Sequence, residues 1–268
     1  MNIELGINGI GLWTHGLTNW DAFAAAARDD YACAGAEWVK PAPTVIPGRE
    51  RRRAPLMVKL AVEVMEQACQ MAAVDLQVVT SVFASAMGDS EITEYMCATL
   101  AGEQKMLSPT KFHNSVHNAP AGYWSISTKN HAASTFVSGF ENSFAIALLE
   151  ATVICATESV PVALAAYDIA TSEPLTGVCP ISQPFGCALV LEPAGAKTGW
   201  TIAITHAAGS ATSIDVAPPF VRERIQANPA ARCLLLLDAL ARERTEEVRW
   251  PTGSGTCIGV RLIATTDS

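Results

Sequence analysis

The segments SFAIALLEATVI at residues 143–154 and VPVALAAYDI at residues 160–169 decide the fold class of this chain. The first segment is apolar on almost every side, which is typical of a helix buried on all sides. The second is a continuous apolar run with the length and composition of a strand that is covered on both faces. A buried helix that leads into a buried strand predicts an α/β architecture, in which helices cover a central sheet.

The same alternation of strands and helices extends in both directions along the chain, which supports the α/β class. Apolar residues at helical spacing predict a helix over residues 57–71, and a buried strand follows it. We predict strands at 3–13, 76–85, 186–193 and 199–207, helices at 91–101 and 230–243, an irregular segment at 108–133 with a short helix near 122–127, and a terminal hairpin formed by 246–250 and 256–264.

Composition limits the class of protein and its partners. The chain has 268 residues, 50% of them hydrophobic, which is enough for one sizeable core. Its formal net charge of −8 provides no broad basic surface, so we do not expect nucleic acid as a partner. The N-terminal residues lack a signal-peptide pattern, and no uninterrupted apolar stretch reaches the roughly 18 residues of a membrane span. We therefore expect a cytoplasmic protein that does not cross a membrane.

No pattern in the sequence indicates a metal or a cofactor. The eight cysteines are scattered singly without a CxxC pair, so we expect reduced and mostly buried thiols. His113 and His117 are four residues apart, but the segment HNSVHNAP is poor helix material and offers metal ligands no rigid face. GINGIG at residues 6–11 lacks the GxGxxG spacing of a dinucleotide site, so we expect its glycines at a tight strand exit.

The segment VSGFENSF at residues 137–144 places Glu141 at the mouth of the apolar helix. A sharp turn that opens a helix suits a nucleophile, because the free N–H groups there favour negative charge. Glutamate is a poor nucleophile, however, and the chain contains neither a GxSxG elbow nor a P-loop. The turn alone therefore does not define a reaction.

The order and spacing of four segments resemble the amino-terminal half of the β-ketoacyl synthases, enzymes of the thiolase fold. The resemblance covers about residues 1–206. The four segments are INGIGLWTHGLTNWDAF at 7–23, SPTKFHNSVHNAPAGYWSIST at 108–128, VPVALAAYDI at 160–169 and PFGCALVLEPAGAKTGWTIAI at 184–204.

Within this family the chain is most similar to the short synthase-like proteins called chain length factors. These accompany a true synthase in bacterial polyketide-like pathways, including those that make aryl polyene pigments. The resemblance implies a thiolase-like α/β fold with a mixed five-stranded sheet, helices on its faces and a reduced C-terminal half. We expect a synthase-like domain over residues 1–206, with 207–268 holding a linker, a helix and a terminal hairpin that remain of the second half.

A gapless alignment from Asn118 and Gly122 to the family's motifs places Glu141 where a synthase carries its nucleophilic cysteine. The two histidines of the family's second half have no counterpart, because His206 lies in a different context. The resemblance therefore implies a subunit that does not catalyse condensation by itself, and Glu141 is expected to hold its turn together. An autonomous malonyl-thioester decarboxylase that uses Glu141 remains open as an alternative, and so does a degenerate scaffold protein.

The resemblance also implies a partner, a full-length β-ketoacyl synthase, with an acyl carrier protein involved indirectly. If the second half is nearly lost, the apolar helix lacks part of its cover, and uncovered apolar surface indicates an interface. We expect the two sheets to join edge to edge, so that residues 112–126 reach the acyl tunnel of the synthase. The candidate tunnel or interface residues are Phe112, His117, Asn118, Tyr123 and Trp124, with ordinary packing as the other interpretation.

The one dense basic run of the sequence is PGRERRRAP at residues 47–55. It contains Arg49, Arg51, Arg52 and Arg53, and short charge runs of this kind usually form solvated loops. The functional interpretation is a docking site for the acidic carrier protein or for the partner synthase.

Overall fold

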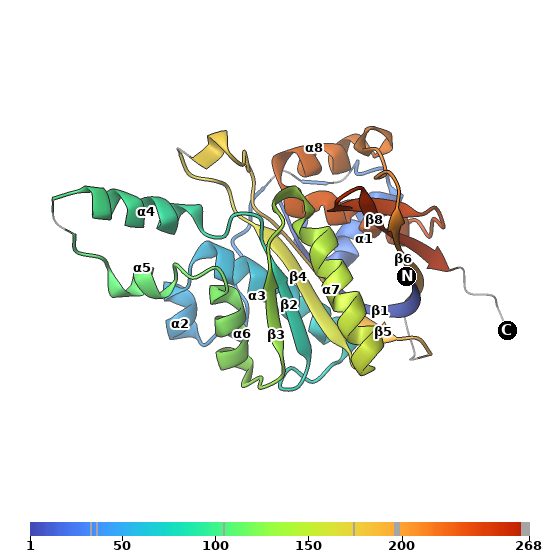
Figure 1. The fold of residues 1–268 in the computed structure, drawn as a ribbon, viewed down its shortest axis with the longest axis horizontal. Helices are drawn as coiled ribbons and strands as arrows, with labels where there is room; N and C mark the ends of the chain where they lie inside the picture. Colours follow the sequence, from blue (N-terminus) through green and yellow to red (C-terminus); the bar gives the residue numbers. More distant parts are fainter. Residues whose placement is uncertain (33, 36, 104, 174, 196–198, 264–268) are drawn as a thin grey trace.

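A computed structural model of the chain describes residues 1–263 except 33, 36, 104, 174 and 196–198. Its described strands form one mixed sheet in the order β3-β2-β4-β5-β1-β6-β8-β7 (Figure 1). Strand β2 is parallel to β3 and β4, and the other neighbours are antiparallel. The strands are β1 Asn2–Trp13, β2 Thr80–Ala84, β3 Ser134–Val137, β4 Val162–Asp168, β5 Phe185–Pro193, β6 Trp200–Ala208, β7 Val248–Gly253 and β8 Thr256–Ile263.

The sheet has eight strands, so the predicted five-stranded sheet is corrected. The first five strands in chain order form one contiguous part of it, and β6 pairs with β1 on one side and β8 on the other. The predicted terminal hairpin, β7 and β8, therefore continues the same sheet. Strand β3 was not predicted from the sequence, because it is only four residues long and none of its residues is fully buried.

Helices cover both faces of the sheet (Figure 1). One apolar core gathers α1, α7, α8 and α9 against one face, and a second core gathers α3 and α6 against the other. The helices are α1 Trp20–Arg28, α2 Gly48–Arg53, α3 Leu56–Ala72, α4 Ser90–Ala101, α5 Pro109–His113, α6 Ala119–Thr128, α7 Ser143–Glu158, α8 Pro219–Ala227 and α9 Leu234–Ala241, with 3-10 turns η1 Phe140–Asn142, η2 Leu175–Gly177, η3 Ile214–Val216 and η4 Pro229–Cys233.

Two glycines of β1 let helix α3 approach the sheet closely. A Cβ atom at Gly9 would lie 1.9 Å from the carbonyl oxygen of Ala68, and one at Gly11 would lie 1.9 Å from that of Val64. These glycines lie inside β1 beneath α3, so the predicted tight strand exit is wrong. Because neither glycine has a side chain, the backbone of α3 can lie directly against the backbone of β1.

Helix α7 extends four residues beyond its predicted end, to Glu158. Ala147, Leu148 and Ala151 are fully buried, whereas Val153 is 40% exposed. The prediction of burial on all sides is therefore wrong, because one stripe of the helix has no cover in the single chain. Among the described residues, the segment Phe140–Glu158 alone has the length and composition of a membrane span, and its buried side packs on the sheet as a core helix does.

The segment between β2 and β3 forms an arm that projects away from the sheet (Figure 1). Helix α4 extends outward with only Ser90 and Ile92 buried, and α5 lies on the returning segment. The return ends in α6, which packs on α3, β2 and β3. The segment predicted to be irregular thus holds two helices, each started by a proline in its first turn.

Candidate functional site

The candidate site lies where the parallel strands β3, β2 and β4 end. Carboxyl ends of parallel strands meet at one edge of a sheet, so the loops after Ala84, Val137 and Asp168 lie together. Open α/β sheets generally bind ligands at such an edge. The loop after β3 contains Glu141, the residue that the sequence singled out.

The turn between β3 and α7 has an unusual backbone. Phe140 has a φ of 50°, in the left-handed region that bulky residues rarely adopt. The Ser143 hydroxyl donates to the Phe140 carbonyl at 2.8 Å and accepts from the Gly139 N–H at 3.0 Å. Gly139 leaves room for Ile146, whose Cδ1 would lie 2.2 Å from a Cβ atom at that position. The turn is therefore bonded within itself, with Phe140 at its apex and Glu141 one residue beyond.

Glu141 forms an ion pair with Arg232 of η4, with 2.7 Å between Oε2 and Nη2. Its side chain is 73% exposed, so the pair contributes little free energy of folding, on the order of 0–1 kcal/mol. The carboxylate nevertheless ties the turn to a segment about 90 residues later in the chain. This contact agrees with the expectation that Glu141 holds the turn.

Asp168 is the most deeply buried carboxylate at this edge, and the sequence analysis did not single it out. Its Oδ1 accepts hydrogen bonds from the Ser85 hydroxyl at 2.7 Å and the Ala86 N–H at 2.8 Å, and more weakly from the Met87 N–H at 3.4 Å. The Gly88 N–H donates to the Ser85 hydroxyl at 2.9 Å. Burial raises the pKa of Asp168 to about 7, although these hydrogen bonds act in the opposite direction. The aspartate thus fixes the root of the arm.

His117 fixes the returning end of the arm to the same root. Its ring lies 4.5 Å from the ring of Phe136 in β3 and hydrogen-bonds the backbone of Met87. Burial lowers the pKa of His117, and the bond to Met87 acts in the opposite direction. The ring also presses against Gly88, whose φ of 68° and closeness to the imidazole both require glycine. His117 therefore packs the returning end of the arm against β3 and the loop after β2.

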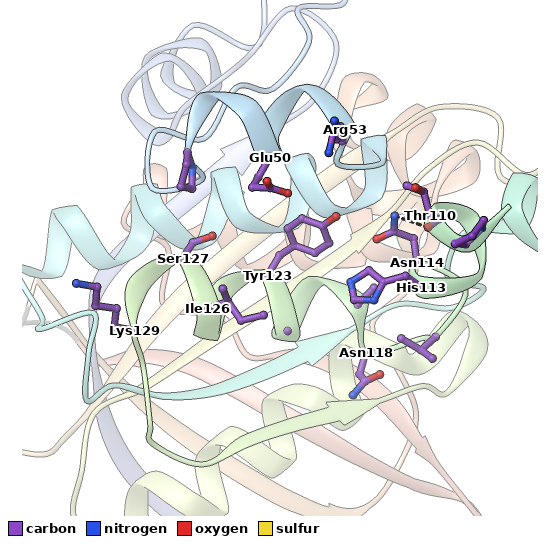
Figure 2. Close-up of a pocket in the computed structure, with 15 residues that line it drawn as sticks. Glu50, Arg53, Thr110, His113, Asn114, Asn118, Tyr123, Ile126, Ser127 and Lys129 are labelled. Carbon is purple, nitrogen blue, oxygen red and sulfur yellow. Dashed lines mark hydrogen bonds between the residues drawn. The ribbon is translucent and has the colours of Figure 1, made fainter.

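A cavity of about 710 Å³ opens between α2, α5 and α6 (Figure 2). Tyr123 and Ile126 of α6 line it, and the rings of Tyr123 and His113 lie 6.4 Å apart. Arg53 and Lys129 place positive charge on its walls. Its other lining residues are Pro47, Glu50, Pro109, Thr110, Asn114, Val116, Asn118, Ala119, Gly122 and Ser127.

The five residues predicted to line a tunnel or an interface lie in different environments. Tyr123 and Asn118 line the cavity, whereas Phe112 is exposed on α5. Trp124 is fully buried in the core beneath α3, so packing is its role and the prediction that it lines a tunnel is corrected. A helix brings neighbours such as Tyr123 and Trp124 to different faces, which the sequence could not assign without knowing which face meets the core.

The predicted basic cluster is a short helix, α2, rather than a loop. Arg51 donates to the carbonyl oxygens of Ala42 and Pro43 at 3.2 and 2.7 Å, so it supports the preceding loop. Arg49 and Arg52 are exposed, and Arg53 faces the cavity. The cluster thus contains one structural arginine and three that are available to a partner.

Nothing in the described turn supplies a thiol. The segment Ser138–Asn142 contains no cysteine, and nearby Cys179 is buried, with a pKa raised by burial and then by the charges of Asp168 and Glu141. Within the described residues, no three histidine, cysteine or acidic side chains gather in a metal-binding group. Asp168 bonds Ser85 and the backbone after β2, His117 bonds the backbone of Met87, and Glu141 pairs with Arg232, so each of these side chains holds a loop in place.

The family profile described as beta-ketoacyl synthase, N-terminal domain matches residues 20–250. This chain belongs to the β-ketoacyl synthase family. The match extends across both predicted parts of the chain, and the mixed sheet with helices on its faces agrees with the thiolase-like fold expected from the resemblance. No curated protein matches the sequence.

Several solved structures share this β-ketoacyl synthase fold. The complex of the ketosynthase ApeO with its chain length factor ApeC from Xenorhabdus doucetiae is matched at 21% identity and a TM-score of 0.72, over 97% of this chain and 99% of that one. The ishigamide ketosynthase/chain length factor is matched at 14% identity and a TM-score of 0.70, over 97% and 99%. The AntDE:AntF complex of a type II polyketide acyl carrier protein with its ketosynthase is matched at 12% identity and a TM-score of 0.71, over 98% and 99%.

Proposed function

We propose that this chain is a non-catalytic chain length factor that pairs with an active β-ketoacyl-ACP synthase and shapes its acyl tunnel. The synthase would extend chains held on acyl carrier protein in a fatty acid or polyketide-like pathway, with aryl polyene synthesis as the expected type. The family membership and the nearly full-length match to chains from ketosynthase/chain length factor complexes support the proposal.

The turn before α7 is the observation that carries the proposal. Condensation needs a thiolate to hold the acyl group as a thioester, and the turn offers Phe140 and Glu141 instead of a cysteine. A carboxylate would form a labile anhydride, and this one is engaged by Arg232. The same ion pair disfavours Glu141 as the catalytic group of a decarboxylase. The chemistry is therefore assigned to the partner.

The open edge of the sheet supports the pairing. Among the described strands, β3 pairs with β2 alone, and its sequence STFV contains no lysine or proline that would protect an edge. The neighbouring α6 exposes Ile126, and the arm exposes Phe112 and Val116. An unprotected strand beside exposed apolar side chains is suited to a second protein that adds its own sheet.

The cavity supports a role in setting chain length. It lies against α6, the helix that packs on β3, and Tyr123 is the bulkiest aromatic side chain on its wall. A partner joined at β3 would bring its acyl chain toward this region. The side chains of Tyr123 and Ile126 would then decide how far the chain extends.

Reconstitution with a full-length β-ketoacyl synthase from the same organism tests the proposal. We expect a stable heterodimer that elongates malonyl units on the carrier protein, whereas this chain alone elongates none. Tyr123→Ala is expected to lengthen or broaden the products measured by mass spectrometry. Tyr123→Phe keeps the ring volume and is the matched control, with products like those of the unmodified protein.

Two outcomes would select the alternatives. Release of CO₂ from malonyl-carrier by the chain alone, lost in Glu141→Gln, would favour an autonomous decarboxylase. A heterodimer whose products are unchanged in Tyr123→Ala would favour a scaffold without a tunnel role. A chain that remains monomeric beside the synthase contradicts the proposal altogether.

A further inference from the structure

Phe140 differs from the other described non-glycine residues with positive φ. Ala73, Lys129 and Ser159 directly follow helices α3, α6 and α7, which is the usual place for a left-handed residue. Tyr31 is buried and its hydroxyl bonds Asp238. Phe140 instead precedes helix α7, and the residue is 57% exposed, so neither a helix cap nor core packing accounts for its backbone.

The surrounding contacts hold Phe140 in this strained position. The Ser143 hydroxyl fixes its carbonyl, and the Asn142 N–H donates to the Gly139 carbonyl at 2.9 Å. On the far side, the Glu141–Arg232 ion pair fixes the next residue. A bulky residue in the left-handed region is kept only where its surroundings over-determine it, and such positions concentrate at functional sites.

The turn that contains Phe140 directly follows the terminal strand of the sheet. Phe140 follows the last residue of β3 by three positions, and β3 is the terminal strand of the sheet. The loop that contains η2 follows β4 at the carboxyl end of the same parallel strands, and its Val178 is 68% exposed. Phe140 and Val178 thus expose apolar side chains in the loops that follow β3 and β4, and Phe140 is only three residues from the strand at which a second sheet would join.

We propose that Phe140 is an anchor residue for the partner synthase, with its ring inserted into a pocket of the synthase beside the β3 edge. This inference rests on the proposed heterodimer and identifies a contact that specifies the partner. A large rigid aromatic buried at the centre of an interface often carries much of the binding free energy. The strained turn holds the ring outward before the partner arrives, so little side-chain freedom is lost on binding.

Substitutions at Phe140 separate anchoring from a structural role. Phe140→Ala removes the ring and keeps the strained backbone, whereas Phe140→Gly removes both. We expect each to weaken binding to the immobilised partner synthase by about 30-fold or more in surface plasmon resonance. We also expect the isolated Phe140→Gly chain to melt about 2–4 °C higher than Phe140→Ala, because glycine adopts this backbone without strain.

Two further variants serve as controls. Phe140→Tyr keeps a ring of similar size and is expected to restore affinity to within about threefold of the unmodified chain. Val216→Ala removes an exposed apolar side chain of η3, outside the β3 edge, and is expected to leave affinity unchanged. If a variant chain does not purify alone, the dissociation constant is measured by diluting the co-purified heterodimer.

The results distinguish this inference from the proposed function. If the unmodified chain binds the synthase and Phe140→Gly binds equally well, the anchor is refuted while the heterodimer stands. If the unmodified chain does not bind the synthase, the proposed function fails first. A loss of affinity in Phe140→Ala that Phe140→Gly recovers would show that backbone geometry, and not the ring, matters to the partner.

Discussion

Replacing Asp168 by asparagine tests the cost of a buried charge at the root of the arm. The three hydrogen bonds that the carboxylate accepts all reach Oδ1, and among the described residues Oδ2 is buried without a partner. Asparagine keeps an acceptor in place of Oδ1 and puts an NH₂ group where no acceptor is used. We therefore expect Asp168→Asn to fold with the arm in place.

The size of the effect follows from the pKa of Asp168, which burial raises from 3.8 to about 7. Because the folded state holds this proton more tightly than the unfolded state, folding stability from this group falls as pH rises between these two values. Each tenfold change in proton affinity corresponds to about 1.4 kcal/mol, so the ionised carboxylate costs up to about 4 kcal/mol above pH 7. About 3 kcal/mol of this cost arises between pH 5 and pH 8.

Urea unfolding at pH 5, 6, 7 and 8 measures this cost as the difference between Asp168→Asn and the unmodified chain. We expect the variant to gain about 3 kcal/mol of relative stability across the range, with most of the gain below pH 7. Groups such as Glu247, whose pKa is lowered mainly by Arg249 and Thr205 against the effect of burial, occur in both proteins and cancel in the difference. Asp75→Asn makes the same chemical change at an exposed position and is the control. A difference that does not vary with pH would refute the burial argument.

Two further predictions concern packing and the basic helix. Gly9→Ala is expected to lower the free energy of unfolding by about 3 kcal/mol or more, because its Cβ would lie 1.9 Å from the Ala68 carbonyl oxygen. Gly122→Ala, with nothing within 4 Å, should be neutral or slightly stabilising, and equal losses in urea unfolding would contradict this account. Arg51→Ala is expected to cost about 1–2 kcal/mol through two lost hydrogen bonds, whereas exposed Arg52→Ala should change unfolding by less than about 0.5 kcal/mol. Similar values for the two arginines would argue against a structural role for Arg51.

The sequence predicts the parts of this fold that bury continuous apolar runs. Strand β4 and helix α3 lie close to their predicted bounds and α7 begins at its predicted residue, because burial selects their composition. Strand β3 could not be found this way, since its four residues are half-exposed and acquire strand geometry from pairing with β2. Helix α2 could not be predicted for a similar reason. It buries no side chain, so its sequence shows no apolar residues at helical spacing.

The candidate site was predictable only in part. The motif around residues 137–144 located the turn before α7. The positive φ of Phe140 could not be predicted, because it depends on contacts that form only in the folded chain. Asp168 is the last residue of an apolar, buried strand. A charged residue at the end of such a run is unusual, so the sequence alone could have indicated that Asp168 has a special role. Its partners in the loop after β2 depend on the parallel pairing of β2 with β4, which the sequence does not reveal.

The segment after residue 206 helps to hold the turn before α7 in place. Trp250 of β7 packs against Phe144 at the start of α7, with 5.4 Å between ring centroids, and its indole N–H donates to the Arg232 carbonyl at 2.9 Å. Arg232 in turn binds Glu141. This chain of contacts runs from the terminal hairpin through η4 to the residue beside Phe140. Removing the hairpin would therefore loosen the turn that holds Phe140, and with it the contact that we propose for the partner synthase.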